Sequence, residues 1–318
     1  MAPTSNRTAY TALLVYAGII GFSFLFIKYA LTVAAPMDIL AHRFTISLAA
    51  ALLAVAFGWM RLAIRLRDVL AVLPLALFYP ALFFSFQMFG LSYTTSSEAG
   101  IVQATAPALT TIIAYFALGE RPGLWQKLSV VLSMAGVIFM FVMSGARFEG
   151  NSTLGMALIA VSALALAGYG VLARKMSQRF RVADMTFMMS LIGFVTFNAI
   201  SVVQHASAHT LSAYFLPFAS PLFIMSILYL GIVASLVSSF LSNYSLSRLE
   251  AYKVSAFNNV STLITIVAGV VLLKEQLEYY HFIGAVLIIA GVLGTNLLRT
   301  PDKGFKTKRA AAASGKAG

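Results

Sequence analysis

The sequence contains no cysteine and very little charge. None of its 318 residues is Cys, and Asp, Glu, Lys and Arg together make up 10% of the chain. The first absence excludes disulfide, thiolate and cysteine–metal chemistry. The second is unusual for a protein that faces water, because charged residues normally cover such a surface. A soluble globular domain is therefore a poor explanation of this chain.

Apolar residues take the place of the missing charge. They account for 60% of the chain, and the mean hydropathy is +0.89. Apolar runs of about 20 residues, the length that crosses a hydrocarbon core, recur along the sequence. We predict ten transmembrane helices, at 10–33, 38–60, 69–91, 96–118, 124–145, 153–173, 184–204, 221–245, 251–273 and 279–298. The predicted fold class is an all-α, polytopic membrane protein.

Basic residues outnumber the scarce acidic ones, and they are concentrated on one side of the predicted helices. The chain has 22 Lys and Arg against 10 Asp and Glu. Most of the basic residues fall on the side that carries both termini, and this bias predicts cytoplasmic termini in a cell membrane. We expect the basic tail to be disordered and to lie near anionic lipid. We expect no nucleic-acid partner.

The two halves of the sequence resemble each other. At a shift of 155 positions, IVQATAPALTTIIAYFALGE lies over AFNNVSTLITIVAGVVLLKE, with Gln103 on Asn258 and Glu120 on Glu275. Because each half holds five spans, the second copy enters the membrane from the opposite face. Such inverted five-helix repeats are the architecture of many secondary transporters, with the substrate site at the midplane between them.

The repeat predicts the domain organisation. Residues 1–9 are a cytoplasmic N-terminal tail, residues 10–145 the first repeat, residues 153–298 the second repeat, and residues 299–318 a cytoplasmic basic tail. The sequence leaves the choice between a monomer and a homodimer open.

A polar stripe lies inside the apolar segment 99–122. Gln103, Pro107 and Thr110 recur at i, i+4 and i+7, so they share one helix face. Pro107 removes the intrahelical partner of the Gln103 carbonyl, and hydrocarbon offers no replacement. The corresponding residues of the second repeat are Asn258, Thr262 and Thr265. We predict that the two stripes meet at a midplane substrate site, with hydrogen bonding between helices as the alternative.

Further polar side chains inside the predicted spans are candidates for the same wall, with helix packing as the alternative for each. Tyr79 precedes Pro80, which predicts a local kink. The other candidates are Gln87 and Asn243, followed by Ser23, Tyr169, Asn198 and Ser239.

Charged residues are predicted at helix ends. The outer cluster consists of Lys28, Asp38, His42, Arg43 and Glu98. The mirrored inner cluster consists of Arg174, Asp184 and Lys253. The two clusters suit gates that close alternately by ion pairing, and basic groups at the outer vestibule could attract a carboxylate. The alternative for Lys28 and Arg43 is snorkelling to the interface.

The positions of the titratable groups limit how transport can be coupled to a proton or sodium gradient. No carboxylate is predicted near the membrane centre, where proton and sodium relays usually place one. His42 is the one group predicted inside a span that titrates near neutral pH, since His205, His209 and His281 are expected in or beside outer loops. These positions predict facilitated or exchanging transport, or proton coupling through His42 at most.

Glu120 and Glu275 each end a predicted helix. A carboxylate is unfavourable at a helix C-terminus, so a local donor should compensate it. We expect a structural role that locks the turn, with the N-terminus of the following helix as the donor.

The chain resembles a known family from about residue 10 to residue 298. The segments that carry the resemblance are GFSFLFIKYAL (21–31), HRF (42–44), APALTTIIAYFALGE (106–120) and GVIFMF (136–141). They are similar to the EamA branch of the drug/metabolite transporter superfamily. The resemblance implies a ten-helix, two-repeat transporter of the cytoplasmic membrane, most often an exporter of amino acids or similar metabolites.

Five positions match the motifs of that family: Lys28, Arg43, Pro107, Glu120 and Glu275. Two positions depart from it. Ile20 replaces a tryptophan often found near the first motif, and Thr262 stands where the first half has Pro107.

Other functions lack sequence support. The chain contains no HExxH, GxSxG or aspartate-rich metal motif, so we predict no enzyme activity, no metal and no cofactor. An integral-membrane enzyme and a channel or sensor on the same scaffold are the alternatives to a carrier. The basic vestibule, the aromatic residues and the lack of a buried acid favour a neutral, zwitterionic or anionic small molecule as substrate.

Overall fold

The computed structural model describes residues 6–63, 66–118, 123–145, 152–177, 179–249, 251, 254 and 257–297. Over these ranges the chain is helical and contains no strand, as predicted. The first half forms α1 (Asn6–Leu31), α2 (Pro36–Ala56), α3 (Leu66–Ala76), η1 (Leu77–Leu82), α4 (Phe83–Tyr93), α5 (Ser96–Gln103), α6 (Ala106–Leu118) and α7 (Leu124–Gly145). The second half forms α8 (Ser152–Met176), α9 (Val182–Ser207), η2 (Leu211–Ala213), η3 (Leu216–Ala219), α10 (Pro221–Leu228), η4 (Tyr229–Val237), α11 (Ser238–Arg248), α13 (Asn258–Leu272) and α14 (Tyr279–Leu297).

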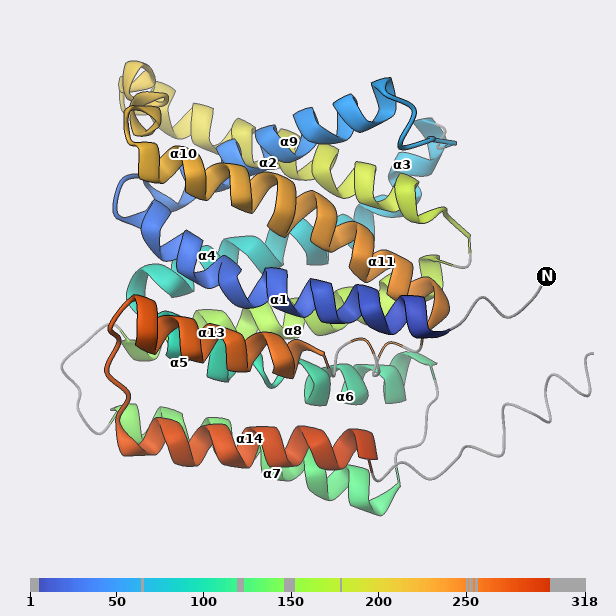
Figure 1. The fold of residues 1–318 in the computed structure, drawn as a ribbon, viewed down its shortest axis with the longest axis vertical. Coiled ribbons are helices and arrows are strands. Elements are labelled where there is room, and N and C mark those ends of the chain that lie inside the picture. The colour runs from blue at the N-terminus through green and yellow to red at the C-terminus, as the bar shows by residue number, and fades with distance from the viewer. Residues whose placement is uncertain are drawn as a thin grey trace, which may run out of the picture.

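The helices lie side by side in one bundle (Figure 1). From one edge to the other, the order is α9 and α2, then α10 and α11, then α1 with α4 and α8, then α13 with α5, and last α14 with α7. We call the end of the bundle where α1 begins the proximal end, and the end where α1 finishes the distal end. Helix α14 finishes at the proximal end, where α1 begins.

Within the part of the chain that the structure describes, seven helices are long and apolar enough to cross a membrane: Arg7–Leu31, Pro36–Ala56, Asp68–Tyr93, Ser96–Ala117, Ser152–Met176, Val182–Ser207 and Pro221–Arg248. Three shorter apolar helices are Lys127–Gly136, Val260–Leu272 and Tyr279–Gly291. The chain is therefore a multi-pass membrane protein. The shorter helices lie within the predicted spans 124–145, 251–273 and 279–298, so ten complete spans stay a prediction.

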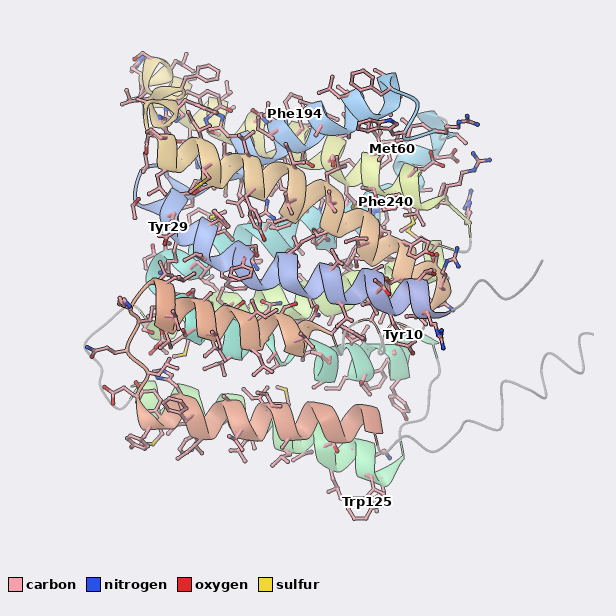
Figure 2. The ribbon with its side chains drawn as sticks, in the orientation of Figure 1. Tyr10, Tyr29, Met60, Trp125, Phe194 and Phe240 are labelled. Atoms are coloured by element: carbon pink, nitrogen blue, oxygen red, sulfur yellow. The ribbon has the colours of Figure 1, made fainter. Side chains whose placement is uncertain are left out.

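The outer surface of the bundle is apolar (Figure 2). Trp125 is 63% exposed and Phe240 is 39% exposed, and these large side chains point away from the bundle. In water such a surface would drive association. In a bilayer it faces hydrocarbon of the same polarity.

Several long helices are interrupted near their middle. Tyr79 has φ −146° and ψ 115°, which are not helical, and these angles mark a kink within the segment η1 between α3 and α4. The kink predicted at Tyr79–Pro80 is thus confirmed. A π-helical segment, η4, joins α10 to α11. Such segments are rare and occur frequently at functional sites.

Pro107 marks a helix boundary. Helix α5 ends at Gln103 and α6 begins at Ala106, so Pro107 lies in the first turn of α6, where a missing N–H removes no intrahelical hydrogen bond. The proline separates two short helices, whereas a continuous kinked helix was expected.

Small residues allow the central helices to approach closely. A Cβ atom on Gly100 of α5 would stand 2.9 Å from Thr265 Cγ2 of α13. One on Gly21 of α1 would stand 3.0 Å from the Ser261 carbonyl oxygen. Only glycine fits at these contacts. The backbones of α1, α5 and α13 therefore meet at the centre of the bundle.

Candidate functional site

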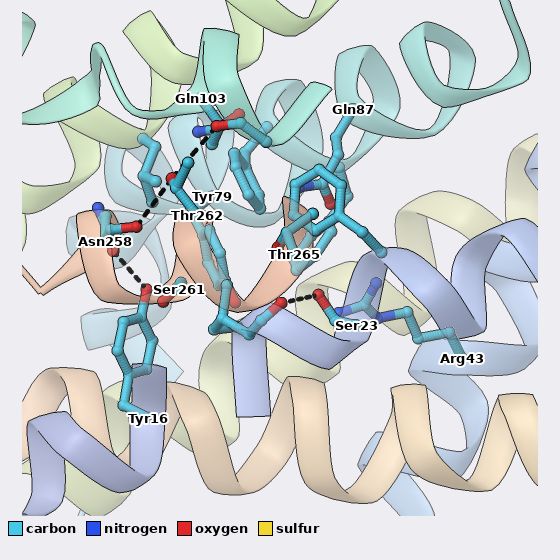
Figure 3. A pocket seen from close by; sticks show the side chains of 16 residues that line it. Tyr16, Ser23, Arg43, Tyr79, Gln87, Gln103, Asn258, Ser261, Thr262 and Thr265 are labelled. Carbon is cyan, nitrogen blue, oxygen red and sulfur yellow. Dashed lines mark hydrogen bonds between the residues drawn. The ribbon is translucent and has the colours of Figure 1, made fainter. Parts of the chain in front are cut away.

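A buried cavity lies where helices of the two halves meet (Figure 3). Its volume is about 30 Å³, which is room for about two water molecules. The lining residues come from α1, α2, η1, α4, α5, α8 and α13, and they are Tyr16, Ile20, Ser23, Phe24, Arg43, Tyr79, Phe83, Phe84, Gln87, Gly100, Gln103, Leu166, Asn258, Ser261, Thr262 and Thr265.

The polar stripe predicted in the second half lines this cavity. Asn258, Thr262 and Thr265 share one face of α13. The hydroxyl of Thr262 donates to the Asn258 carbonyl oxygen (3.0 Å) and lies 3.2 Å from the Gly100 carbonyl oxygen, while that of Thr265 donates to the Gly21 carbonyl oxygen (2.9 Å). These hydroxyls thus join helices, which was the alternative role, and they also line the cavity, while substrate binding stays a prediction.

The stripe of the first half divides at the helix boundary. Gln103 lines the cavity, and its Oε1 accepts a hydrogen bond from the Ser162 hydroxyl (3.0 Å). Thr110 donates to the Ala106 carbonyl oxygen (2.8 Å) and lines a neighbouring cavity. Pro107 is buried and is not among the residues that line either cavity.

Tyr79 and Gln87 line the cavity from the interrupted helix. The Tyr79 hydroxyl lies 3.2 Å from Ser239 Oγ, and its ring stacks on Tyr169 with centroids 4.6 Å apart. The non-helical backbone at Tyr79 displaces its side chain from the regular helical track. Local irregularity at Tyr79–Pro80 is therefore what shapes this part of the wall.

Two polar residues of the cavity wall, Tyr16 and Ser261, were not predicted from the sequence. The Tyr16 hydroxyl donates to Asn258 Oδ1 at 3.3 Å (Figure 3). A signal for Tyr16 was present, because Tyr16, Ile20 and Ser23 recur at i, i+4 and i+7 on one face of α1. Tyr16 is aromatic, and its surroundings in the sequence are apolar, so it was not distinguished from a packing residue.

A second cavity adjoins the first on its proximal side. The two share Tyr16, Leu166 and Asn258, so the Tyr16–Asn258 hydrogen bond stands between them. The other residues of the second cavity are Thr110, Tyr169, Gly170, Ser242, Leu246, Ala251 and Val254.

Arg43 lies in the wall of the first cavity, although it was predicted at the outer vestibule. It is 1% exposed. Its Nε donates to Ser235 Oγ (2.6 Å) and its Nη2 to the Ala234 carbonyl oxygen (3.2 Å). Its guanidinium lies 4.1 Å from the ring centroid of Phe84. The hydrophobic pattern of α2 does not reveal how deep one residue lies in the bundle.

Two predicted wall residues instead join helices away from this cavity. Asn243 accepts a hydrogen bond from the Tyr169 hydroxyl (2.7 Å) and donates to Thr186 Oγ1 (3.2 Å). Asn198 of α9 donates to Thr45 Oγ1 of α2 (3.0 Å) and accepts from the Tyr214 hydroxyl (2.7 Å). Hydrogen bonding between helices, the alternative weighed for both, describes these contacts.

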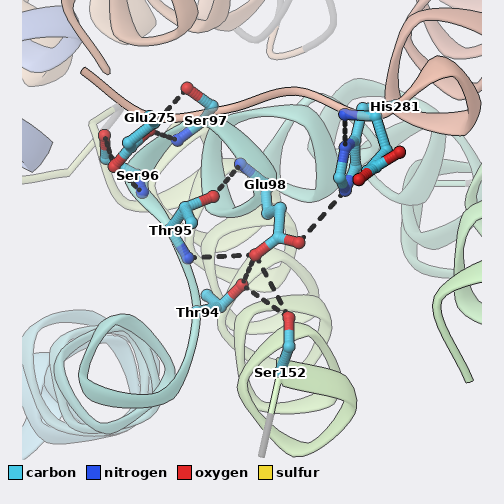
Figure 4. Close-up of polar contacts among 9 residues, drawn as sticks. Thr94, Thr95, Ser96, Ser97, Glu98, Ser152, Glu275 and His281 are labelled. Carbon is cyan, nitrogen blue, oxygen red and sulfur yellow. Dashed lines mark hydrogen bonds and ion pairs between the residues drawn. The ribbon is translucent and has the colours of Figure 1, made fainter. Parts of the chain in front are cut away.

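A polar network closes the distal end of the bundle (Figure 4). The Glu275 carboxylate accepts hydrogen bonds from the amides of Ser96 (2.8 Å) and Ser97 (2.9 Å). It also accepts from the hydroxyls of these two serines, at 2.8 and 2.6 Å. The carboxylate thus satisfies the N-terminus of α5, where negative charge is favourable. The predicted donor was the helix that follows Glu275, and the structure shows a helix from the other half.

Glu98 is the second carboxylate of this network. It accepts from the Thr95 amide (3.0 Å), from the Ser152 hydroxyl (3.1 Å) and from the Thr94 hydroxyl. With the Thr95 side chain, it forms a capping box at the start of α5. The ammonium of Lys28 donates to the carbonyl oxygen of Thr94, so α1 joins the network.

His281 lies in the first turn of α14, beside the loop that precedes this helix, and its Nε2 is 3.0 Å from Glu98 Oε1. Its Nδ1 accepts the Glu278 amide (2.9 Å), so Nε2 carries the proton and donates to Glu98. His42 is therefore not the one histidine within the helices.

The remaining members of the predicted outer cluster face α9 and the η2–η3 segment. Asp38 Oδ1 lies 3.0 Å from His205 Nε2 and accepts from the Ser201 hydroxyl. His42 Nε2 lies 2.9 Å from the Tyr214 carbonyl oxygen. Burial, with Asp38 as a smaller cause, raises the pKa of Tyr214 above its ordinary value. The structure thus divides the predicted outer cluster among three places.

The described members of the inner cluster bind backbone groups. Arg174 Nη1 donates to the Leu246 carbonyl oxygen (2.6 Å), and Asp184 Oδ1 accepts from the Ala63 amide (2.8 Å). Lys253 and Glu120 lie outside the described residues, as do the tails 1–5 and 298–318. Among the described residues, no group of three or more His, Asp or Glu side chains is placed to hold a metal ion.

Comparison with known sequences identifies the family. The description "EamA-like transporter family" applies to two stretches of this chain, residues 7–142 and 153–297. The chain belongs to the EamA-like transporter family. Its two EamA domains cover nearly all of the described helices. A solved crystal structure that is 18% identical has the same fold, with a TM-score of 0.60 over 92% of this chain and 96% of the other.

Relatives of this EamA-like chain are named as transporters. The "Uncharacterized transporter YcxC" of Bacillus subtilis is 57% identical over 297 residues, which are 93% of this chain and 95% of the relative. The "Probable amino-acid metabolite efflux pump" of Escherichia coli is 26% identical over 197 residues, which are 61% of this chain and 65% of that protein. A transporter of this family acts on a small-molecule substrate within a lipid bilayer.

Proposed function

We propose that this EamA-like protein is a secondary carrier that exports amino acids or related small metabolites by alternating access. The observation that carries the proposal is the buried cavity, which receives polar side chains from both EamA domains. Polar groups within spans are costly and usually line a solute path. The Escherichia coli relative, named as an amino-acid metabolite efflux pump, supports the class of solute.

We infer that the two EamA domains are inverted repeats of five helices each. A shift of 155 positions places η1, Leu77–Leu82, over residues 232–237, which lie inside η4. Matching positions of the two halves thus depart from regular α-helix, through a kink at Tyr79 in the first half and a π-helical segment in the second. Gln103 and Asn258, a matched pair in the repeat, line the same cavity. Both observations suit a carrier whose substrate site lies between the repeats.

The positive-inside bias supports cytoplasmic termini in the cell membrane. With that orientation, the distal network faces the outside and the second cavity faces the cytoplasm. Helix α5 is then held closed on the outer side by Glu275 and Glu98. The Tyr16–Asn258 hydrogen bond is the remaining barrier toward the inside.

Transport is facilitated or exchanging in this proposal, because none of the described residues that line the first cavity is acidic. His42 stays the candidate for proton coupling, although it faces the η2–η3 segment. In proteoliposomes, an imposed pH gradient should produce no strong uphill accumulation of solute. Strong accumulation that survives His42→Ala would overturn this part of the proposal.

Two measurements test the carrier hypothesis as a whole. The natural chain has no cysteine, so Trp59→Cys, at the proximal end, and Phe215→Cys, at the distal end, each carry a single thiol. We expect an impermeant thiol reagent to label only Phe215→Cys in intact cells, and the opposite pattern would refute the orientation.

Saturable counterflow of a labelled amino acid is expected for a carrier. A channel would give no counterflow, and an enzyme would alter the solute.

A further inference from the structure

Arg43 brings a permanent positive charge into the cavity wall without a matching negative charge. It is 1% exposed, and the partners of its Nε and Nη2 are a serine hydroxyl and a backbone carbonyl. The Phe84 ring below it is also neutral. A buried cation held only by neutral groups is strongly unfavourable. Such groups in membrane proteins mark functional sites.

Two donors in the cavity wall have no hydrogen-bond partner. They are Nη1 of Arg43 and Nε2 of Gln103, and both atoms are buried. Arg43 approaches from α2 and Gln103 from α5, on different sides of the cavity (Figure 3). Nearly all buried polar groups in proteins are satisfied. Two unpaired donors at one small cavity therefore indicate a missing acceptor.

The carboxylates that could serve as this acceptor are engaged elsewhere in the described structure. Glu275 binds the N-terminus of α5, Glu98 binds His281, and Asp38 binds His205. None of the described residues that line the cavity is acidic. No carboxylate of the described residues is therefore placed as the counter-ion of Arg43, and a bound ligand can supply one.

We propose that the cavity binds the carboxylate of an organic acid, with Arg43 as its counter-ion and the Gln103 amide as a second donor. The inference rests on the proposed function, in which this cavity is the substrate site. A guanidinium pairs with a carboxylate through two parallel hydrogen bonds. The apolar body of the acid packs on Phe24, Phe83 and Leu166. An α-amino acid and the corresponding 2-oxo acid share this chemistry.

Binding to the purified full-length protein tests the proposal. The probes are 3-phenylpropionate and its neutral amide, 3-phenylpropionamide, followed by phenylalanine and phenylpyruvate to separate the two sources of carboxylate. Titration calorimetry should give tighter binding of the acid than of the amide. Arg43→Gln should weaken the acid about 10- to 100-fold and the neutral amide much less, because the charged pair is lost only for the acid, while Arg43→Lys should retain part of the preference.

Gln103→Leu keeps the bulk of the side chain and should weaken the acid about tenfold, as expected for one donor to a charged group. Arg179→Gln is the matched control, because Arg179 also lies over an aromatic ring, at 5.2 Å from the Phe180 centroid, but is exposed outside the cavity. It should not change the preference. Equal binding of acid and amide by the natural protein would overturn the proposal, and so would a folded Arg43→Gln variant that keeps the preference.

Counterflow of labelled phenylalanine separates this inference from the proposed function. If counterflow is saturable and unchanged in Arg43→Gln, the carrier hypothesis holds and the carboxylate site is wrong. If acids bind through Arg43 but no labelled acid crosses the membrane, the carboxylate site holds and the carrier hypothesis is wrong.

Discussion

The central cavity and the distal network use similar polar groups in opposite ways. In the distal network, the Glu275 carboxylate receives four hydrogen bonds from Ser96 and Ser97. In the cavity, donors of Arg43 and Gln103 have no partner. The distal network satisfies the hydrogen-bonding capacity of its polar groups within the protein. The cavity leaves its two donors available to a ligand.

This difference separates structural polarity from binding polarity. A fully satisfied buried network stabilises one conformation, whereas unsatisfied groups destabilise the protein until something pairs with them. Burial alone would not distinguish the two regions, because both contain buried polar residues. The number of unpaired donors does distinguish them.

Removing the carboxylate at the distal end should have the largest effect. Glu275→Ala leaves two amides and two hydroxyls of α5 without their acceptor, so we expect a loss of about 2–4 kcal/mol in the free energy of unfolding. Unfolding of the purified protein in detergent measures the loss. Gln276→Ala alters an exposed neighbour and should stay within about 0.5 kcal/mol of the natural protein. Equal stability of the two variants would show that the network is not structural.

Crowding the contact between α5 and α13 should have an intermediate effect. A Cβ on Gly100 would stand 2.9 Å from Thr265 Cγ2, so Gly100→Ala should lower the free energy of unfolding by about 1–3 kcal/mol through overpacking. Gly18 of α1 has no atom within 4 Å of its added Cβ. Gly18→Ala should therefore be neutral or stabilising, as expected for alanine in a helix. The same unfolding measurement compares the two, and a smaller loss at Gly100 than at Gly18 would contradict the close contact.

Removing the hydroxyl between the two cavities should have the smallest effect on stability and a visible effect on access. Tyr16→Phe loses one hydrogen bond to Asn258, worth about 1 kcal/mol. In a Ser23→Cys background, we expect the added thiol to react about fivefold faster with a charged thiol reagent, since 1 kcal/mol corresponds to about that ratio. Tyr244→Phe removes a tyrosine hydroxyl whose partner is Thr8, away from the cavity, and should not change the rate. An unchanged rate in Tyr16→Phe would rule out a barrier at this bond.

The helical fold follows from composition and local pattern, which the sequence displays directly. The kink at Tyr79–Pro80 was predictable because proline restricts the residue before it. The effect of Pro107 was predicted less well, since the same residue suits a kink or the first turn of a new helix. The structure shows the second outcome, with α5 ending at Gln103 and α6 beginning at Ala106.

The site was also partly predictable, because some of its residues follow from local spacing in the sequence. Gln103 and Asn258 were found from helical spacing and the repeat, and both line the cavity. The depth of Arg43 and the pairing of Glu98 with His281, 183 positions apart, depend on how helices pack. Local spacing carries no information about contacts between segments so distant in the chain.

The small volume of the cavity has a consequence for affinity. Space for about two water molecules is far less than any metabolite occupies, so a solute must push the walls apart as it enters. The measured affinity is then the contact energy minus the work of that expansion. Trimming a bulky wall residue such as Phe83 would lessen the work, and a guest could bind more tightly without gaining a single new contact.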